Sequence, residues 1–145
     1  MTPARLAAQC VELLGRLDGP VDVRGSEALA RALAAALPPG RDGDAPVAAV
    51  CDFRDEPSEH APWAARLAPL AARLQAGAVL VVVDHNQPRT WWRRALGMLV
   101  LVARGFPPMR ARYPTAREIA ARGFVVERLR LLDGERVQLV RARRR

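Results

Sequence analysis

The sequence contains no lysine, because all 23 of its basic residues are arginine. Cysteine is scarce: Cys10 and Cys51 stand far apart, and with two histidines they form no recognisable metal-ligand pattern. We expect two buried thiols, the usual state of free cysteine. No apolar run is longer than Met98–Ala103, which is too short to span a bilayer. The N-terminal stretch lacks the apolar block and cleavage site of a signal peptide, so we expect a soluble, cytoplasmic protein.

The residues that are present suit one folded domain with an uneven charge. Half of the 145 residues are apolar, so the chain can bury a core, and we expect a single domain over residues 1–145. Residues 1–88 hold eight arginines and eleven acidic residues, which gives a net charge of −3. Residues 89–145 hold fifteen arginines and four acidic residues, which gives a net charge of +11. A basic half of this kind meets nucleic acid, anionic lipid or an acidic partner, or it merely solvates helix and strand surfaces.

Apolar periodicity, helix-capping residues and turn residues predict strands and helices that alternate along the chain. The run Val79–Val83 is apolar without alternation, which indicates burial on both faces, as in a parallel sheet. Asp133 and Gly134 separate two β-rich runs and predict a two-residue hairpin turn. The predicted order is helix 3–17, strand 21–25, helix 26–37, strand 46–53, helix 58–75, strand 79–83, helix 91–103, a short helix between Thr115 and Gly123, and strands 124–132 and 135–143.

Several segments between Val47 and Arg143 follow one another in a characteristic order. The first is PVAAVCDF (46–53), the second is LAPLAARLQAGAVLVVVDHNQP (67–88), and the third is YPTAREIAARGFVVERLRLL (113–132), with the terminal hairpin after it. In this order the chain resembles the class I S-adenosylmethionine (SAM)-dependent methyltransferases. The resemblance implies an α/β, Rossmann-like fold with a mostly parallel sheet and a C-terminal antiparallel hairpin.

The stretch before these segments departs from the family. Family members begin with a strand and a glycine-rich loop that wraps the cofactor, and the matching stretch here is Val21–Glu27. It contains Asp22 and one glycine, Gly25, but Arg24 and Glu27 place side chains where a close backbone approach to a ligand needs none. Two βα units of about 30 residues each are missing, so the resemblance implies a shortened fold with a degenerate cofactor loop. SAM is the implied cofactor, and the positions carried over for its binding are Asp22, Arg24, Gly25, Ser26, Asp52 and Phe53.

Three polar residues, Asp84, His85 and Asn86, follow the apolar run at the sheet edge where ligands bind in open α/β folds. We predict catalytic roles for the first two. His85 either acts as a general base on an acceptor hydroxyl or fixes the loop by hydrogen bonding. Asp84 either orients His85 or binds the acceptor, or else it caps the strand and loop. Asn86 is predicted to bind the substrate.

The segment that follows is predicted to cover this edge and to contact the substrate through Trp91 and Tyr113. On a helix, Trp91 and Trp92 point in directions about 100° apart. We therefore expect one of them in the core and the other at a pocket mouth, a partner surface or a lipid headgroup layer. The stretch Ala95–Ala103 is apolar nearly all round, which predicts burial within the domain or against another chain.

Three functions fit these residues. The first is a methyltransferase-like module that has lost its own catalysis or depends on a partner chain. The second is an active SAM-dependent methyltransferase for a small molecule, since methyl transfer needs little beyond proximity and alignment. The third is a basic module for nucleic acid or a membrane surface, with nucleic acid disfavoured because no aromatic nucleic-acid motif is present. The open sheet edge near Val21–Gly25 and the apolar helix 91–103 predict a protein partner, by default a second copy.

Overall fold

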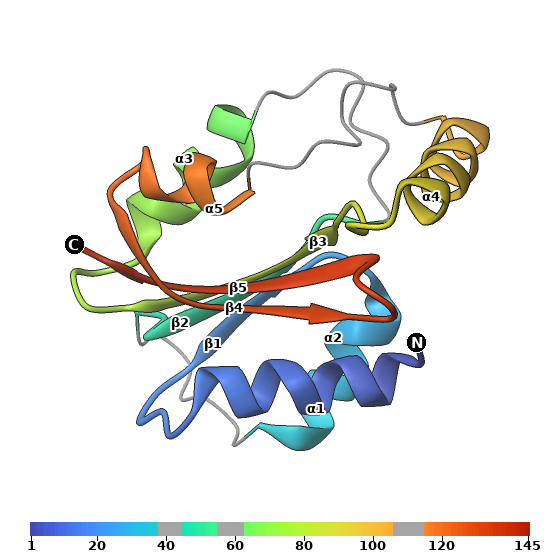
Figure 1. The fold of residues 1–145 in the computed structure, drawn as a ribbon. Coiled ribbons are helices and arrows are strands. Elements are labelled where there is room, and N and C mark those ends of the chain that lie inside the picture. The colour runs from blue at the N-terminus through green and yellow to red at the C-terminus, as the bar shows by residue number, and fades with distance from the viewer. Residues whose placement is uncertain (38–44, 55–62, 106–114) are drawn as a thin grey trace.

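A five-stranded sheet forms the centre of the molecule in the computed structural model (Figure 1). The structure describes residues 1–37, 45–54, 63–105 and 115–145, and for residues 63–66 it describes the backbone alone. Three parallel strands lie side by side, and an antiparallel hairpin extends the sheet beside the third of them. The strand order is β1 (Val21–Arg24), β2 (Ala48–Asp52), β3 (Val79–His85), β5 (Val137–Arg144) and β4 (Phe124–Leu132).

Helices cover both faces of this sheet (Figure 1). On one face lie α1 (Pro3–Leu14) and α2 (Glu27–Ala36), and on the other lie α3 (Trp63–Arg73) and α5 (Thr115–Ala120). The remaining helix, α4 (Trp91–Ala103), stands beyond the carboxyl end of β3 (Figure 1). The predicted α/β class, with a mostly parallel sheet and a C-terminal antiparallel hairpin, is confirmed.

Side-chain caps begin the two helices on the first face. The hydroxyl of Thr2 accepts a hydrogen bond of 3.4 Å from the backbone N–H three residues on, and the hydroxyl of Ser26 accepts one of the same length. Thr2 and Ser26 are therefore the N-caps of α1 and α2. The first helix ends at Leu14 rather than at residue 17, because Gly15 adopts a φ of +73° and stops it there.

Each helical layer covers an apolar cluster of its own, and each cluster contains one cysteine. Cys10 and Cys51 are free and fully buried, as predicted. Burial raises the pKa of the Cys10 thiol to about 12, and the negative charge of Asp52 adds to this effect. The thiol is therefore protonated and unreactive at neutral pH. The largest fully buried side chains of the two clusters include Leu6, Leu13, Leu29, Leu33, Leu67, Leu70, Ile119 and Phe124.

The hairpin connection differs from the prediction. Leu132 pairs with Val137, so residues 133–136 form a four-residue connection rather than a two-residue turn. Asn86 explains the difference. Its side-chain amide donates to the carbonyl of Glu135 at 2.8 Å, and its backbone N–H donates to the next carbonyl at 2.7 Å. These bonds hold the connection at the end of β3, outside the hairpin ladder.

Other element boundaries follow from strand pairing. The third strand runs through His85 rather than ending at Val83, because β5 pairs with it as far as Val137. In the parts of the chain that the structure describes, β1 pairs only with β2 and forms one edge of the sheet, as predicted. The predicted helix 58–75 is α3 where the structure describes it, and its predicted start lies outside the described residues.

The structure corrects the prediction for the tryptophans of α4. Trp91 is 78% exposed and Trp92 is 50% exposed, so the expectation that one of them enters the core is wrong. The reason is that α4 faces the rest of the molecule with the side that carries Gly97 and Leu101, and the tryptophans lie on other sides. No residue of α4 is buried, so the predicted burial of Ala95–Ala103 within the domain does not occur.

Candidate functional site

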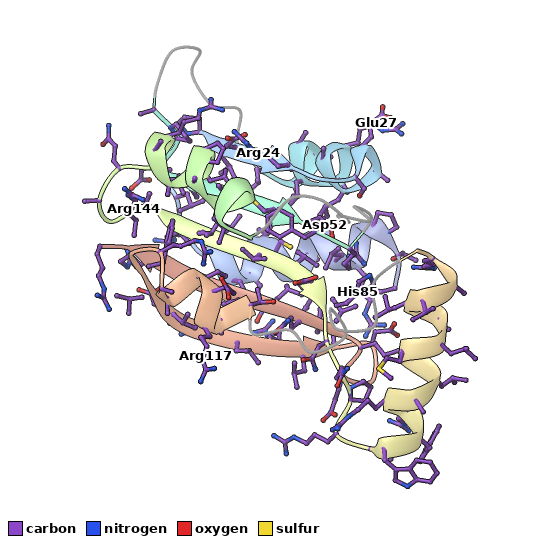
Figure 2. All side chains as sticks on the ribbon, turned by 90° about the horizontal axis from the view of Figure 1, so that it is seen from above. Arg24, Glu27, Asp52, His85, Arg117 and Arg144 are labelled. Carbon is purple, nitrogen blue, oxygen red and sulfur yellow. The ribbon has the colours of Figure 1, made fainter. Side chains whose placement is uncertain are left out.

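The carboxyl ends of the three parallel strands meet at one edge of the sheet. Asp52 ends β2 and His85 ends β3, and Figure 2 shows both at the edge that faces α4. Arg24, at the end of β1, lies farther from that helix (Figure 2). Side chains from three separate stretches of sequence therefore gather at the place where ligands bind in open α/β sheets.

Asp52 is buried and its carboxylate is fully engaged by a neighbour in sequence. Arg54 donates to Oδ1 from its backbone N–H at 3.1 Å and from Nε at 2.8 Å, and to Oδ2 from a terminal guanidinium nitrogen at 2.6 Å. This bidentate ion pair fixes Arg54, whose side chain is only 20% exposed, across the end of β2. The carboxylate that was predicted to contact the cofactor is thus paired with the guanidinium of Arg54 in the same chain.

Gly25 packs directly against the same aspartate. A Cβ atom placed on Gly25 would lie 2.6 Å from the Cβ of Asp52 and 2.7 Å from its carbonyl oxygen. The residue also adopts a φ of +127°, which side-chain-bearing residues rarely accept. Glycine is therefore required here because β1 closes onto β2, and the space beside its Cα is filled by the protein itself.

Three other residues predicted to bind the cofactor also have partners within the fold. The Asp22 carboxylate accepts from Nε of Arg24 at 3.3 Å, and it forms an ion pair with a guanidinium nitrogen of Arg73 at 3.4 Å. Phe53 is buried in the core, and its backbone N–H donates to the carbonyl of Val83 at 3.0 Å. These contacts tie β1 to α3 and β2 to β3.

A buried polar network surrounds Asp84. Its Oδ1 accepts from the backbone N–H of His85 at 2.7 Å, and its Oδ2 accepts from the hydroxyl of Thr115 at 2.9 Å. The side-chain amide of Gln138 donates to that hydroxyl at 2.8 Å and to the carbonyl of His85 at 3.0 Å. These contacts are those of a residue that caps the strand end. Thr115 was predicted only as the start of a short helix, and Gln138, a buried polar residue between apolar neighbours in β5, was not predicted as part of a site.

The His85 ring is held in one tautomer. Its Nε2 lies 3.0 Å from the backbone carbonyl of Arg54, so this nitrogen carries a hydrogen and donates it. Burial lowers the pKa of His85, and the positive charges of Arg54 and Arg104 also lower it, while the hydrogen bond to the Arg54 carbonyl opposes them. At neutral pH the ring is therefore neutral, with Nδ1 as its basic nitrogen.

A pocket of about 440 Å³ lies between α4 and this edge of the sheet. Three of the predicted site residues line it: Ser26, His85 and Asn86. Tyr113 lies outside the described residues. The structure thus brings one predicted cofactor residue, one predicted base and one predicted substrate residue to a single cavity. The predicted residues outside its lining are Asp22, Arg24, Gly25, Asp52, Phe53, Asp84 and Trp91.

The pocket lining carries strong positive charge. Arg54, Arg94, Arg104 and Arg136 line it, whereas Asp133 is the acidic residue among its described lining residues. These arginines come from the end of β2, from α4 and from the hairpin connection. This cluster was not predicted from the sequence, because its members are distant in sequence and converge only in the folded chain.

Neither a metal centre nor a membrane span is found in the described part of the chain. Among those residues no group of three or more histidines, cysteines and acidic residues could hold a metal ion. No helix there is long and apolar enough to cross a bilayer.

Comparison with known proteins yields structural matches alone. No family model and no curated protein sequence matches the chain. The mitomycin 7-O-methyltransferase MmcR superimposes with a TM-score of 0.63 at 17% identity, covering 99% of this chain and 53% of MmcR. The pyocyanin biosynthetic protein PhzM gives 0.60 at 18% identity, covering 98% of this chain and 55% of PhzM. OxaC in complex with sinefungin and meleagrin gives 0.56 at 17% identity, covering 99% of this chain and 41% of OxaC.

The chain has a shortened class I SAM-dependent methyltransferase fold. It spans about half the length of MmcR and PhzM, and less of OxaC. Within this methyltransferase fold, the pocket beside His85 occupies the carboxyl edge of the sheet. OxaC has also been crystallised with SAH and oxaline, so a structural neighbour holds the demethylated form of the cofactor.

Proposed function

We propose that the chain is a methyltransferase-like module that does not bind SAM tightly on its own. The contact between Gly25 and Asp52 carries this proposal. In the family that the sequence resembles, glycines after the first strand allow the cofactor to approach the backbone. In this chain Asp52 lies against that position, and Arg54 covers the adjacent strand end through its ion pair with Asp52. The residues present therefore do not fit the cofactor.

The sheet order supports the same proposal. With β1 at the edge, no further strand is described that would supply the groups around the ribose and adenine. A calorimetric titration of the isolated chain with SAM, and separately with SAH, tests the proposal. We expect no saturable binding below about 100 μM. A Kd near about 1 μM for either compound would contradict it.

We further propose that a second copy of the chain covers the outer face of α4. This face consists of exposed apolar residues and carries no charge; its members are Trp91, Trp92, Ala95, Leu96, Leu99, Val102 and Ala103. Soluble monomers rarely expose a contiguous apolar patch beyond a few hundred Å². Pairing across a two-fold axis needs only one self-complementary surface, and here it would bury no charge.

Sedimentation of Leu99→Asp tests this pairing. Leu99 is 67% exposed at the centre of the outer face, and Leu129 on β4, which is 51% exposed, offers a matched control. We expect a dimer at micromolar concentration for the wild type and for Leu129→Asp, and a folded monomer for Leu99→Asp. A monomeric wild type would contradict the proposal. Binding of that monomer to anionic phospholipid vesicles would assign the face to a membrane surface instead.

An active small-molecule methyltransferase is the second candidate, favoured by one observation. A neutral His85 lines a cavity of about 440 Å³, which is within the usual size range of small-molecule sites. The general-base role predicted for His85 would use Nδ1, because Nε2 is engaged with the Arg54 carbonyl. This candidate replaces the first if the titration shows tight SAM binding.

We do not propose nucleic acid as a partner, because three arginines of the C-terminal hairpin are held by carboxylates within the fold. Arg130 pairs with Glu12 at 2.8 Å, and Arg141 and Arg143 both pair with Glu127, at 2.8 and 2.6 Å. Side chains held in this way add little to a phosphate-binding surface.

A further inference from the structure

The pocket beside α4 carries arginines that have no carboxylate partner among the described residues. Arg94 and Arg104 reach it from α4, and Arg136 reaches it from the hairpin connection. Within the described residues, none of these three forms an ion pair with a carboxylate, in contrast to Arg54 and its partner Asp52. Arginines that converge from two elements onto one cavity concentrate a positive field there.

Two further observations agree on the sign of that field. The N-terminus of α2, a ten-residue helix, contributes Ser26 and Ala28 to the pocket lining, and helix N-termini attract anions. The positive charge of Arg104 also contributes to the lowered pKa of His85 in the pocket wall. Both effects favour a negatively charged occupant and disfavour a cation.

Apolar side chains also line the pocket. Met98, Val100 and Leu101 contribute from α4, and Val137 contributes from the start of β5. A cavity of about 440 Å³ accommodates a small organic molecule rather than a bare ion. An apolar wall facing a basic cluster suits a ligand that has an apolar body and one acidic group.

We propose that this pocket binds a small organic anion, with its carboxylate or phosphate at Arg94, Arg104 and Arg136 and its apolar body against Met98 and Leu101. The proposal goes beyond the function proposed above, because it needs neither SAM nor catalysis. A chain that has closed its cofactor site would retain a small-molecule site next to it. Carboxylates and phosphate monoesters share this recognition chemistry, and separate probes distinguish them.

The test uses three probes with one apolar body, measured by calorimetry on the full chain. They are 2-naphthoate, 2-naphthyl phosphate and the uncharged 2-naphthylmethanol. We expect at least one of the anions to bind at least about ten-fold more tightly than the alcohol. Whichever anion binds more tightly identifies the acidic group. Equal affinity of all three, or no saturable binding of either anion, would overturn the proposal.

Variants locate the site. Arg104→Gln combined with Arg136→Gln should weaken anion binding by about ten-fold or more, whereas Arg128→Gln, an exposed arginine of β4 outside the lining, should leave it unchanged. An added Cβ at Gly97 meets no atom within 4 Å, so Gly97→Leu should fill the pocket without disturbing α4 and abolish binding of all three probes.

The outer face of α4 supplies the remaining control. Leu99→Asp should leave anion binding intact, because Leu99 does not line the pocket. Loss of binding in Leu99→Asp, or an equal loss in Arg128→Gln, would place the probe elsewhere and overturn the proposal. The SAM titration is a separate measurement, so failure of anion binding and failure of the proposed function give different results.

Discussion

Gly25 shows how a single position can decide what the end of a strand is able to hold. Its missing side chain allows β1 to contact Asp52, and its φ of +127° adds a second reason for glycine. We expect Gly25→Ala to lower the free energy of unfolding by at least about 2 kcal/mol. Gly77→Ala, where φ is +85° and an added Cβ meets nothing, should cost about 1 kcal/mol.

Urea denaturation of both variants measures the difference. Equal losses would show that backbone strain alone accounts for Gly25 and that Asp52 yields easily. A larger loss for Gly25→Ala would show that β1 and β2 are in tight contact at this edge.

His85 makes folding stability depend on pH. Its pKa in the folded chain lies below the ordinary value of about 6.5, mainly because the ring is buried. The contribution of His85 to the free energy of unfolding is therefore complete above about pH 6.5. It is lost as the pH falls toward the lowered pKa of the folded chain, since the unfolded chain binds the proton more readily. We expect His85→Gln to reduce this dependence in denaturation experiments between about pH 5 and pH 7. His60→Asn is the control, and a wild-type slope in His85→Gln would contradict the account.

At the scale of elements, features that depend on residues close in sequence were easier to predict than features that depend on long-range contacts. Capping by Thr2 and Ser26 and the apolar run of β3 were readable because each depends on residues close in sequence. The hairpin connection could not be predicted, because Asn86, which binds it, follows a strand that is distant in sequence. The tryptophans of α4 were misplaced because periodicity gives the angle between side chains but not the side that meets the sheet.

Arg141 joins two elements that are remote in sequence. Its guanidinium donates to the carbonyls of Leu13 and Leu14 at the C-terminus of α1, and it also pairs with Glu127. We expect Arg141→Gln to lower the free energy of unfolding by about 1–2 kcal/mol, because the last helical carbonyls lose a partly buried donor. Arg143→Gln, which removes a more exposed partner of the same Glu127, should cost less than about 0.5 kcal/mol. Chemical denaturation measures both, and equal effects would contradict the role of Arg141 at α1.

At the scale of the whole molecule, the sequence predicted the fold class and only part of the site. Ser26, His85 and Asn86 reach the pocket because strand ends of a parallel sheet share one edge. Asp22 and Asp52 were placed at the cofactor by the resemblance, and the structure gives them arginine partners of the same chain. Arg24 and Arg54 lie only two residues from their partners, whereas Arg73 comes from α3 and meets Asp22 only after folding.

We have proposed that the strand end at Gly25 is closed by the protein's own residues. The most direct test is an amide NMR titration of the labelled chain with SAM at concentrations up to about 1 mM. We expect the backbone amides of Gly25, Ser26 and Asp52 not to shift. Saturable shifts at these three amides, with a Kd in the low micromolar range, would show an open cofactor site and contradict the proposal.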